Sequence, residues 1–100
     1  MQIGDLLNKL DDRIDDVRNE RQSLLGKAKR LAKEHAMRVP IKSGPDRRYS
    51  VLVWESDVER DLYKGLEAAA NKLDRKLKEM RQVRKDLAAT AVRATELAFL

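Results

Sequence analysis

The stretch RVPIKSGPDRRYSVLVWESDVE, residues 38–59, decides the fold because it interrupts a chain that otherwise has the composition of long helices. On either side of its Ser-Gly-Pro-Asp segment, residues of β-forming types recur with a period of two, and the second half carries apolar residues on both faces. Ser-Gly-Pro-Asp itself is typical of a turn. The stretch therefore predicts a short β-hairpin over residues 38–54, with Pro40 placing the first strand at an edge.

A helix is expected directly after the hairpin, over residues 57–97. Ser56-Asp57-Val58-Glu59 has the pattern of a capping box, in which the Ser56 hydroxyl accepts from the Glu59 backbone N–H and the Glu59 carboxylate reaches back to the Ser56 N–H. Alternate steps of four and three trace an apolar seam through Leu62, Leu66, Ala69, Leu73, Lys76, Met80, Val83, Leu87, Thr90, Ala94 and Leu97. Leu77 flanks this seam and replaces Lys76 if the register slips there.

An earlier helix is expected over residues 5–36, with Gly4 and Asp5 as its cap. The same steps pass through Ile3, Leu7, Leu10, Ile14, Val17, Arg21, Leu24, Ala28, Leu31 and His35. Eight of these ten residues are apolar, the pattern of a coiled-coil seam. Leu6 and Leu25 widen the stripe, which indicates a bundle rather than a two-stranded rope.

Formal charge favours an antiparallel arrangement of the two helices. Residues 5–26 carry four basic and six acidic side chains (net −2), and residues 27–36 carry four and one (net +3). Residues 55–74 carry three basic and six acidic side chains (net −3), and residues 75–93 carry seven and two (net +5). Folding the chain back on itself sets opposite signs side by side at both ends, whereas a parallel pair would set like signs together.

Two charged side chains, Arg21 and Lys76, fall on the seams. In an antiparallel hairpin Arg21 and Lys76 come within about a turn of each other, so they need acidic partners if they are buried. The alternative is that their long side chains reach solvent, most easily for Lys76.

These patterns predict a mainly α fold, an antiparallel two-helix coiled-coil hairpin with a short β-hairpin at its tip. The 100 residues are expected to form a single domain, residues 1–100. A lone two-stranded ribbon is marginal in water, and the helical stripes leave apolar surface uncovered. The fold is therefore expected to be completed by oligomerisation, as a homo-dimer, or by another protein.

The order helix, β-hairpin, helix, with a strand such as YSVLVW (residues 49–54) running into an acidic helix start, resembles the layout of prefoldin-type chaperone subunits. The resemblance covers the whole chain in element order and implies a hairpin of coiled helices. It transfers no functional residue to this sequence.

Catalysis is not indicated, and an enzyme is not expected. The only histidine, His35, falls on a seam at a helix end, where packing or contact with the helix dipole is the favoured role. The sequence has no glycine-rich phosphate loop, no cysteine and no cluster with metal-ligand spacing, so no cofactor or metal is expected. The pairs Asp11-Asp12 and Asp15-Asp16 can hold a divalent cation, but an acidic face that meets Arg81, Arg84 and Lys85 is favoured.

Two sets of residues are candidate binding sites. A basic set near the β-hairpin suits nucleic-acid phosphates and comprises Lys27, Lys29, Arg30, Lys33, Arg38, Lys42, Arg47 and Arg48. An apolar set suits a protein interface and comprises Tyr49, Val51, Val53, Trp54, Leu97, Phe99 and Leu100.

The sequence leaves two functions open. The first is a non-enzymatic assembly or adaptor protein that binds partner proteins or itself through the coiled-coil hairpin and the ribbon. The second is a small basic nucleic-acid-binding accessory or regulatory protein that uses Arg38, Lys42, Arg47 and Arg48. The sequence has neither a signal-peptide pattern nor an uncharged apolar run of about 18 residues, so a cytoplasmic protein without a membrane partner is expected.

Overall fold

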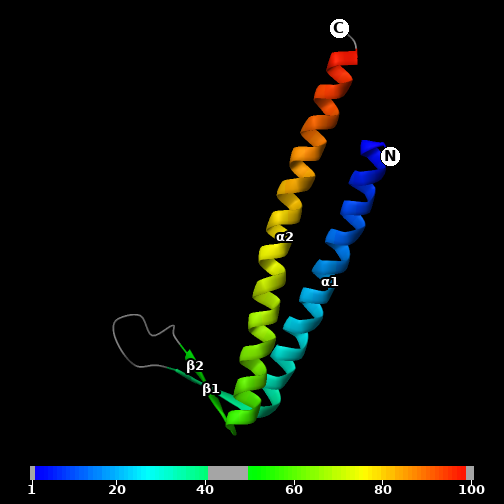
Figure 1. The fold of residues 1–100 in the computed structure, drawn as a ribbon. Coiled ribbons are helices and arrows are strands. Elements are labelled where there is room, and N and C mark those ends of the chain that lie inside the picture. Colours follow the sequence, from blue (N-terminus) through cyan, green and yellow to red (C-terminus); the bar gives the residue numbers. More distant parts are fainter. Residues whose placement is uncertain (1, 41–49, 99–100) are drawn as a thin grey trace, which may run out of the picture. The chain divides into compact units, whose positions relative to one another are not determined.

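The computed structural model describes residues 2–40 and 50–98, with side chains described as far as Arg93. In chain order these residues form helix α1 (Ile3–His35), strand β1 (Ala36–Pro40), strand β2 (Ser50–Trp54) and helix α2 (Asp57–Ala98) (Figure 1). The prediction of a mainly α chain, with two long helices and a short antiparallel β-hairpin between them, is confirmed. Outside the described residues lie the predicted turn and the site candidates Lys42, Arg47, Arg48, Tyr49, Phe99 and Leu100.

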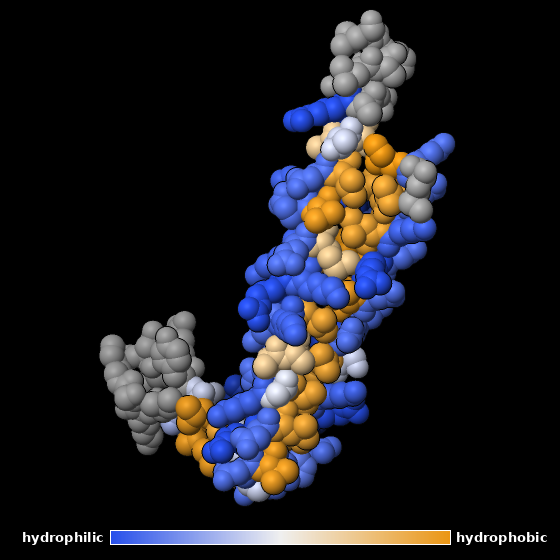
Figure 2. Space-filling model, viewed as in Figure 1, coloured by the Kyte–Doolittle hydropathy of each residue, from blue (hydrophilic) through white to orange (hydrophobic). Residues whose placement is uncertain are grey.

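The chain divides into two compact units, each of which contains parts of both helices. The first unit joins Met1–Gln22 to Asn71–Leu100, and the second is the continuous segment Ser23–Ala70, which includes β1 and β2. Apolar side chains, orange in Figure 2, reach the surface along the helices and beside the strands. We call the antiparallel pair of β1 and β2 the ribbon.

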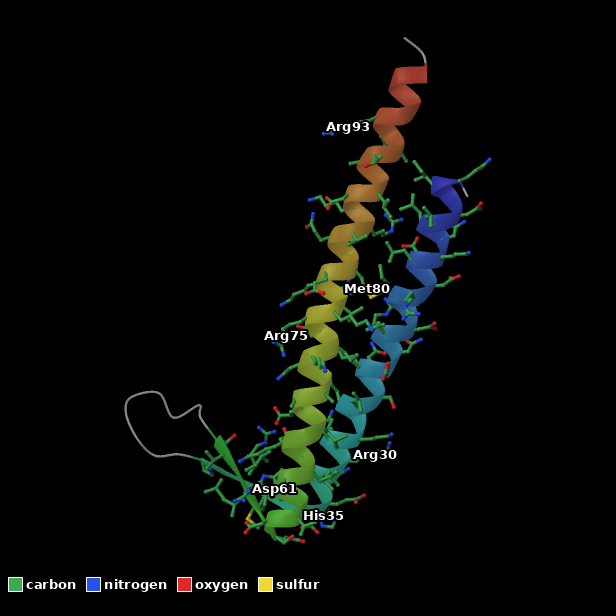
Figure 3. All side chains as sticks on the ribbon, in the orientation of Figure 1. Arg30, His35, Asp61, Arg75, Met80 and Arg93 are labelled. Carbon is green, nitrogen blue, oxygen red and sulfur yellow. The ribbon has the colours of Figure 1, made fainter. Side chains whose placement is uncertain are left out.

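A small apolar cluster between α1 and α2 forms the core of the first unit. Figure 3 shows Met80 pointing from α2 toward α1. The cluster contains Ile14, Val17 and Leu77, which are 8%, 6% and 2% exposed, with Leu10, Leu73 and Met80 packed against them. Because fully burying one aliphatic side chain contributes about 1.5–3 kcal/mol, these few residues hold the two helix segments together.

The predicted seam of α1 is confirmed. All ten of its positions, from Ile3 to His35, are buried or half-buried. Leu6 and Leu25, which were expected to widen the stripe, are 38% and 36% exposed. Heptad spacing alone therefore locates the buried side of this helix.

The predicted seam of α2 is correct at four of its nine described positions and wrong at five, and the side chains of Ala94 and Leu97 lie outside the described part of the chain. Leu66, Leu73, Met80 and Leu87 are half-buried as expected. The alternating positions lie one residue later than predicted: Tyr63, Ala70, Leu77, Arg84 and Ala91 are buried or half-buried, whereas Leu62, Ala69, Lys76, Val83 and Thr90 are exposed. The true seam includes the cation Arg84, so a pattern of apolar residues alone does not predict this register. Arg84 is tolerated on the seam because it has an acidic partner.

That partner is Asp11. Arg84 donates from Nε to one carboxylate oxygen of Asp11 and from Nη2 to the other, the latter at 3.3 Å. The hydrogen bond to Asp11, with the negative charge of that carboxylate, raises the pKa of Arg84. A second ion pair joins Arg21 Nε to Asp74 Oδ1 at 3.6 Å. Later residues of α1 thus meet earlier residues of α2, so the helix segments of this unit run antiparallel, as the charge pattern predicts.

The two seam cations behave differently from each other. Arg21 has Asp74 as its acidic partner, although at 3.6 Å its buried Nε has no hydrogen-bond partner among the described residues. Lys76 is exposed, because Leu77 occupies the seam in its place. The register slip that the sequence allowed at Leu77 is therefore confirmed.

Both helix starts differ in detail from the expected caps. The carbonyl of Gln2 accepts from the backbone N–H groups of Asp5 and Leu6, so Gln2 rather than Gly4 or Asp5 caps α1. Helix α2 begins at Asp57, directly after Ser56 as the capping pattern predicts, and the Ser56 carbonyl accepts from Arg60 N at 3.3 Å. Glu59 Oε2, however, is buried without a hydrogen-bond partner among the described residues, so the reciprocal capping box is not complete.

Candidate functional site

The ribbon begins earlier than the sequence predicts. Helix α1 ends at His35, and β1 follows at once from Ala36. The His35 carbonyl accepts from Glu55 N at 3.0 Å, and His35 Nδ1 lies 3.3 Å from Glu55 Oε2. The last residue of α1 is thus bonded across to the residue after β2, and this contact ends the helix and starts the strand pairing.

One face of the ribbon is apolar and exposed. Antiparallel pairing sets Met37 opposite Val53 and Val39 opposite Val51. Side chains directly opposite each other, and those two residues apart, share a face, so these four residues lie together and form what we call the outer face. Met37 is 70% exposed, Val53 53%, Val51 46% and Val39 38%. A partner that covered this uncharged surface would gain about 25 cal/mol per Å² of apolar area buried.

The opposite face of the ribbon rests on α2. This inner face consists of Ala36, Arg38, Leu52 and Trp54, with Pro40 and Ser50 at its far end. The Trp54 and Tyr63 rings lie with centroids 4.9 Å apart and planes inclined by 46°. Aromatic pairs in such tilted arrangements are attractive, so this contact fixes the ribbon to the start of α2.

Pro40 fits the ribbon without loss of a ladder hydrogen bond. In antiparallel strands, bonded and non-bonded residue pairs alternate. Because Glu55 bonds to His35, the bonded pairs that follow are Met37 with Val53 and Val39 with Val51. The Pro40 nitrogen therefore faces away from β2, as expected for proline in an edge strand.

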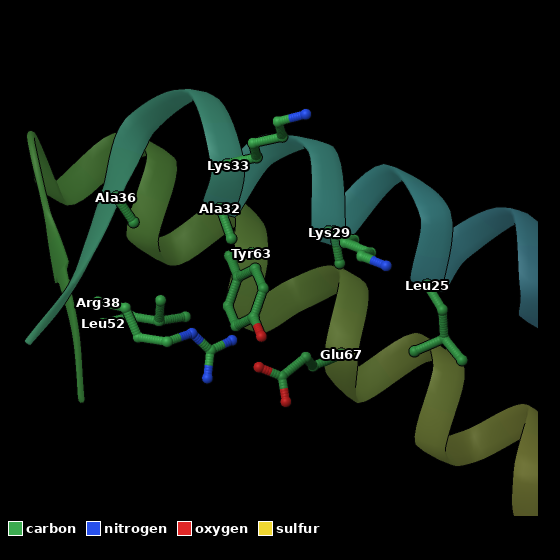
Figure 4. Close-up of a pocket in the computed structure, with 10 residues that line it drawn as sticks. Leu25, Lys29, Ala32, Lys33, Ala36, Arg38, Leu52, Tyr63 and Glu67 are labelled. Atoms are coloured by element: carbon green, nitrogen blue, oxygen red, sulfur yellow. The ribbon is translucent and has the colours of Figure 1, made fainter. Parts of the chain in front are cut away.

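A groove of about 510 Å³ lies between α1, the inner face and the first turns of α2. Its lining comprises Leu25, Ala28, Lys29, Ala32, Lys33, Ala36, Arg38, Leu52, Tyr63 and Glu67, all from the second unit. Figure 4 shows the Arg38 guanidinium and the Glu67 carboxylate pointing toward each other beside the Tyr63 hydroxyl. The groove thus combines an apolar floor with a charged margin.

The Tyr63 hydroxyl is held in its protonated form. Burial is the first cause that raises the pKa of Tyr63, followed by the hydrogen bond to Glu67 and the negative charge of that carboxylate. The Arg38 cation acts in the opposite direction but does not cancel these effects. The phenol of Tyr63 therefore loses its proton only above its ordinary range.

The described members of the predicted basic set divide between two faces of the second unit. Lys29, Lys33 and Arg38 line the groove. Lys27 and Arg30 line a separate shallow hollow of about 340 Å³ together with Leu31 and Glu34. The structure therefore brings three of the predicted cations together and sets the other two apart from them.

The described members of the predicted apolar set also divide. Val51 and Val53 belong to the exposed outer face, whereas Trp54 is half-buried on the inner face. Leu97 lies in α2, but its side chain is outside the described part of the chain. Sequence reasoning missed Met37, because it assigned the residues before Arg38 to the helix and its end. Extending the period-two pattern two residues upstream would have found it.

Two aspartates of the predicted acidic face of α1 have basic partners, and of the three expected partners only Arg84 is among them. Asp11 pairs with Arg84, and Asp15 pairs with Arg18 at 3.2 Å. Among residues 2–40 and 50–98, no group of three or more histidines or carboxylates could hold a metal ion. No helix in this part of the chain is long and apolar enough to cross a membrane.

Comparisons with protein-family models, with curated proteins and with solved structures found no match to this chain. The resemblance to prefoldin-type subunits therefore remains one of element order.

Proposed function

We propose that the chain is a non-enzymatic assembly or adaptor protein, which binds other protein chains, copies of itself included, through the outer face of the ribbon. One observation carries the proposal: Met37, Val39, Val51 and Val53 lie side by side and exposed on a ribbon whose other face is fixed to α2.

An apolar surface of this kind gains stability when another protein surface covers it. A two-stranded ribbon is marginal in water, and this one has helical support on its inner face alone among the described residues. Contiguous exposed apolar residues on a folded protein typically mark an interaction site. Because the outer face carries no charge, a protein surface of β-branched or aromatic side chains complements it better than a polyanion does.

A nucleic-acid-binding role for the basic residues is the second interpretation. It draws support from the exposed cations Lys27, Lys29, Arg30 and Lys33. These cations lie on two faces of α1, and the carboxylates of Glu34 and Glu67 stand among them, which weakens attraction for phosphates. We therefore place this role second.

Photo-crosslinking tests the proposal whatever the identity of the partner. The photoreactive amino acid p-benzoylphenylalanine replaces Val53 in one variant and Ala68, an exposed residue of the same unit, in the control. We expect discrete protein adducts from position 53 that persist at high salt and disappear when Val51→Lys is added, because apolar contacts are not screened by ions. Equal adducts from both positions, or adducts that contain nucleic acid, would contradict the proposal.

A further inference from the structure

We infer that the groove beneath the inner face is a docking site for an acidic segment of a partner protein, with an apolar side chain on the groove floor and carboxylates at Lys29, Lys33 and Arg38. Strand alternation places this site on the side of the ribbon opposite the outer face. The inference therefore goes beyond the proposed function and does not depend on it.

These three cations have no carboxylate within ion-pair distance among the described residues. Five other cations do have one, namely Arg18, Arg21, Arg60, Lys78 and Arg84, whereas Lys27 and Arg30 of the separate hollow have none among the described residues either. Arg38 donates a single long hydrogen bond, 3.4 Å to the Ser50 hydroxyl. Its guanidinium can therefore donate to both oxygens of a partner carboxylate, the two-bond geometry that arginine favours.

The floor of the groove between these cations is apolar. Leu25, Ala28, Ala32 and Leu52 provide an apolar lining, and Ala28 is only 3% exposed. The alanine side chains are small, which leaves the volume of about 510 Å³ unfilled. This volume falls within the range of about 300–1,000 Å³ found for binding pockets, so it accepts one or two apolar side chains.

The surplus of positive charge favours an acidic ligand, and the apolar floor favours a protein segment over a nucleic acid. Three cations against Glu67 leave a surplus of two positive charges around the groove. Base stacking would require a free aromatic ring, but the Tyr63 ring is packed against Trp54. A peptide that alternates leucine with glutamate satisfies both the floor and the cations, whereas a phosphate backbone leaves the floor uncovered.

A peptide titration tests this directly. The probe is a capped peptide of sequence Glu-Leu-Leu-Glu-Glu-Leu, followed by backbone amide NMR and by the fluorescence of Trp54, the only tryptophan. Three controls are matched to it: Lys-Leu-Leu-Lys-Lys-Leu, Glu-Ser-Ser-Glu-Glu-Ser and a short DNA duplex. We expect saturable shifts confined to the groove residues and Trp54 with the first peptide alone. Tighter binding of the lysine peptide or of the duplex overturns the inference, as does the lack of any shift at about 1 mM peptide.

Paired charge reversals on one helix supply the control for electrostatics. Lys29→Glu with Lys33→Glu alters the groove, whereas Lys27→Glu with Arg30→Glu makes the same change of charge at the separate hollow. The first pair should weaken binding of the acidic peptide about tenfold. The second pair should weaken it by no more than about twofold, because exposed ion pairs act at short range. Equal effects of the two pairs would contradict a defined site.

A second set of variants separates this site from the outer face. Ala32→Leu fills the groove without any change of charge and should weaken binding of the acidic peptide. The helical circular-dichroism signal checks that the variant folds. Val51→Lys with Val53→Lys should leave peptide binding unchanged. If that outer-face pair abolishes peptide binding while the fold is retained, the groove is not the site.

Discussion

Trp54 of β2 and Tyr63 of α2 lie with their ring centroids 4.9 Å apart, and this contact joins the last residue of the ribbon to the second turn of α2. It orients the inner face onto the helix and leaves the four residues of the outer face without such support. The ribbon therefore has one face that packs against α2 and one face that is exposed. Because the chain has one tryptophan, its fluorescence comes from Trp54 alone and reports on the surroundings of this ring.

A double-mutant cycle on this ring pair should show a favourable coupling of about 0.5–1.5 kcal/mol, the range for tilted aromatic pairs. The cycle combines Trp54→Ala with Tyr63→Ala and measures the free energy of unfolding in urea. As a control, Trp54→Ala combined with Val83→Ala, which lies in the other unit, should be additive. Additive effects at Trp54 and Tyr63 would show that the rings do not fix the ribbon.

Stability should fall at high pH in a manner that depends on Tyr63. The folded state raises the pKa of Tyr63 above its ordinary value of about 10, so the stability contributed by the neutral phenol is fully present below about pH 10. It is lost as pH rises through the folded pKa. The wild-type protein should therefore lose stability more steeply than Tyr63→Phe above about pH 10, as measured by urea unfolding. An identical pH profile for the two proteins would contradict the assignment, and Tyr49→Phe serves as the matched control.

The register of α2 can be tested with one substitution on each candidate seam. Leu77→Ala should destabilise the protein by about 2–5 kcal/mol, because this side chain is 2% exposed in the core of the first unit. Val83→Ala, on the seam predicted from sequence but 50% exposed, should change stability by no more than about 0.5 kcal/mol. Thermal or urea unfolding of both variants decides between the registers, and a larger loss at Val83 would restore the register predicted from sequence.

The antiparallel pairing in the first unit predicts a rescue by charge exchange. Asp11→Arg alone should lower the melting temperature, since it sets two cations together at Arg84. Adding Arg84→Asp should recover most of that loss, because the ion pair is rebuilt with its members exchanged. The same Arg84→Asp change combined with Asp12→Arg, at the exposed neighbour of Asp11, should give no recovery. Recovery with both partners would mean that only total charge matters.

The sequence predicts those parts of the fold that depend on local pattern. The α1 seam is confirmed at every position because apolar residues recur there at heptad spacing and its one cation, Arg21, is flanked by apolar positions. The predicted α2 seam is wrong at five of its nine described positions because Arg84 occupies a true seam position beside the apolar Val83. The partner that makes Arg84 acceptable, Asp11, is 73 residues away, and no local pattern carries that information.

Local sequence pattern also predicts part of the candidate site. Period-two alternation predicts that Val51 and Val53 lie on one face of their strand, and the register, which sets Val39 opposite Val51, adds Val39 to that face. Met37 joins them only because the contact between His35 and Glu55 ends the helix early, and that contact spans the ribbon. The groove is assembled from residues on both helices and both strands, so no spacing along the chain reveals it.

The central claim, that the outer face is covered by a protein partner, is tested most directly by thiol alkylation. Since the chain has no cysteine, Val53→Cys and the inner-face variant Leu52→Cys each carry a single thiol. In the purified protein at low concentration, the thiol at position 53 should react as fast as one at the exposed Ala68, and the thiol at 52 more slowly. In intact cells that produce the protein, we predict that position 53 becomes strongly protected while Ala68→Cys stays reactive. Equal reactivity of position 53 in cells and in dilute solution would contradict the claim.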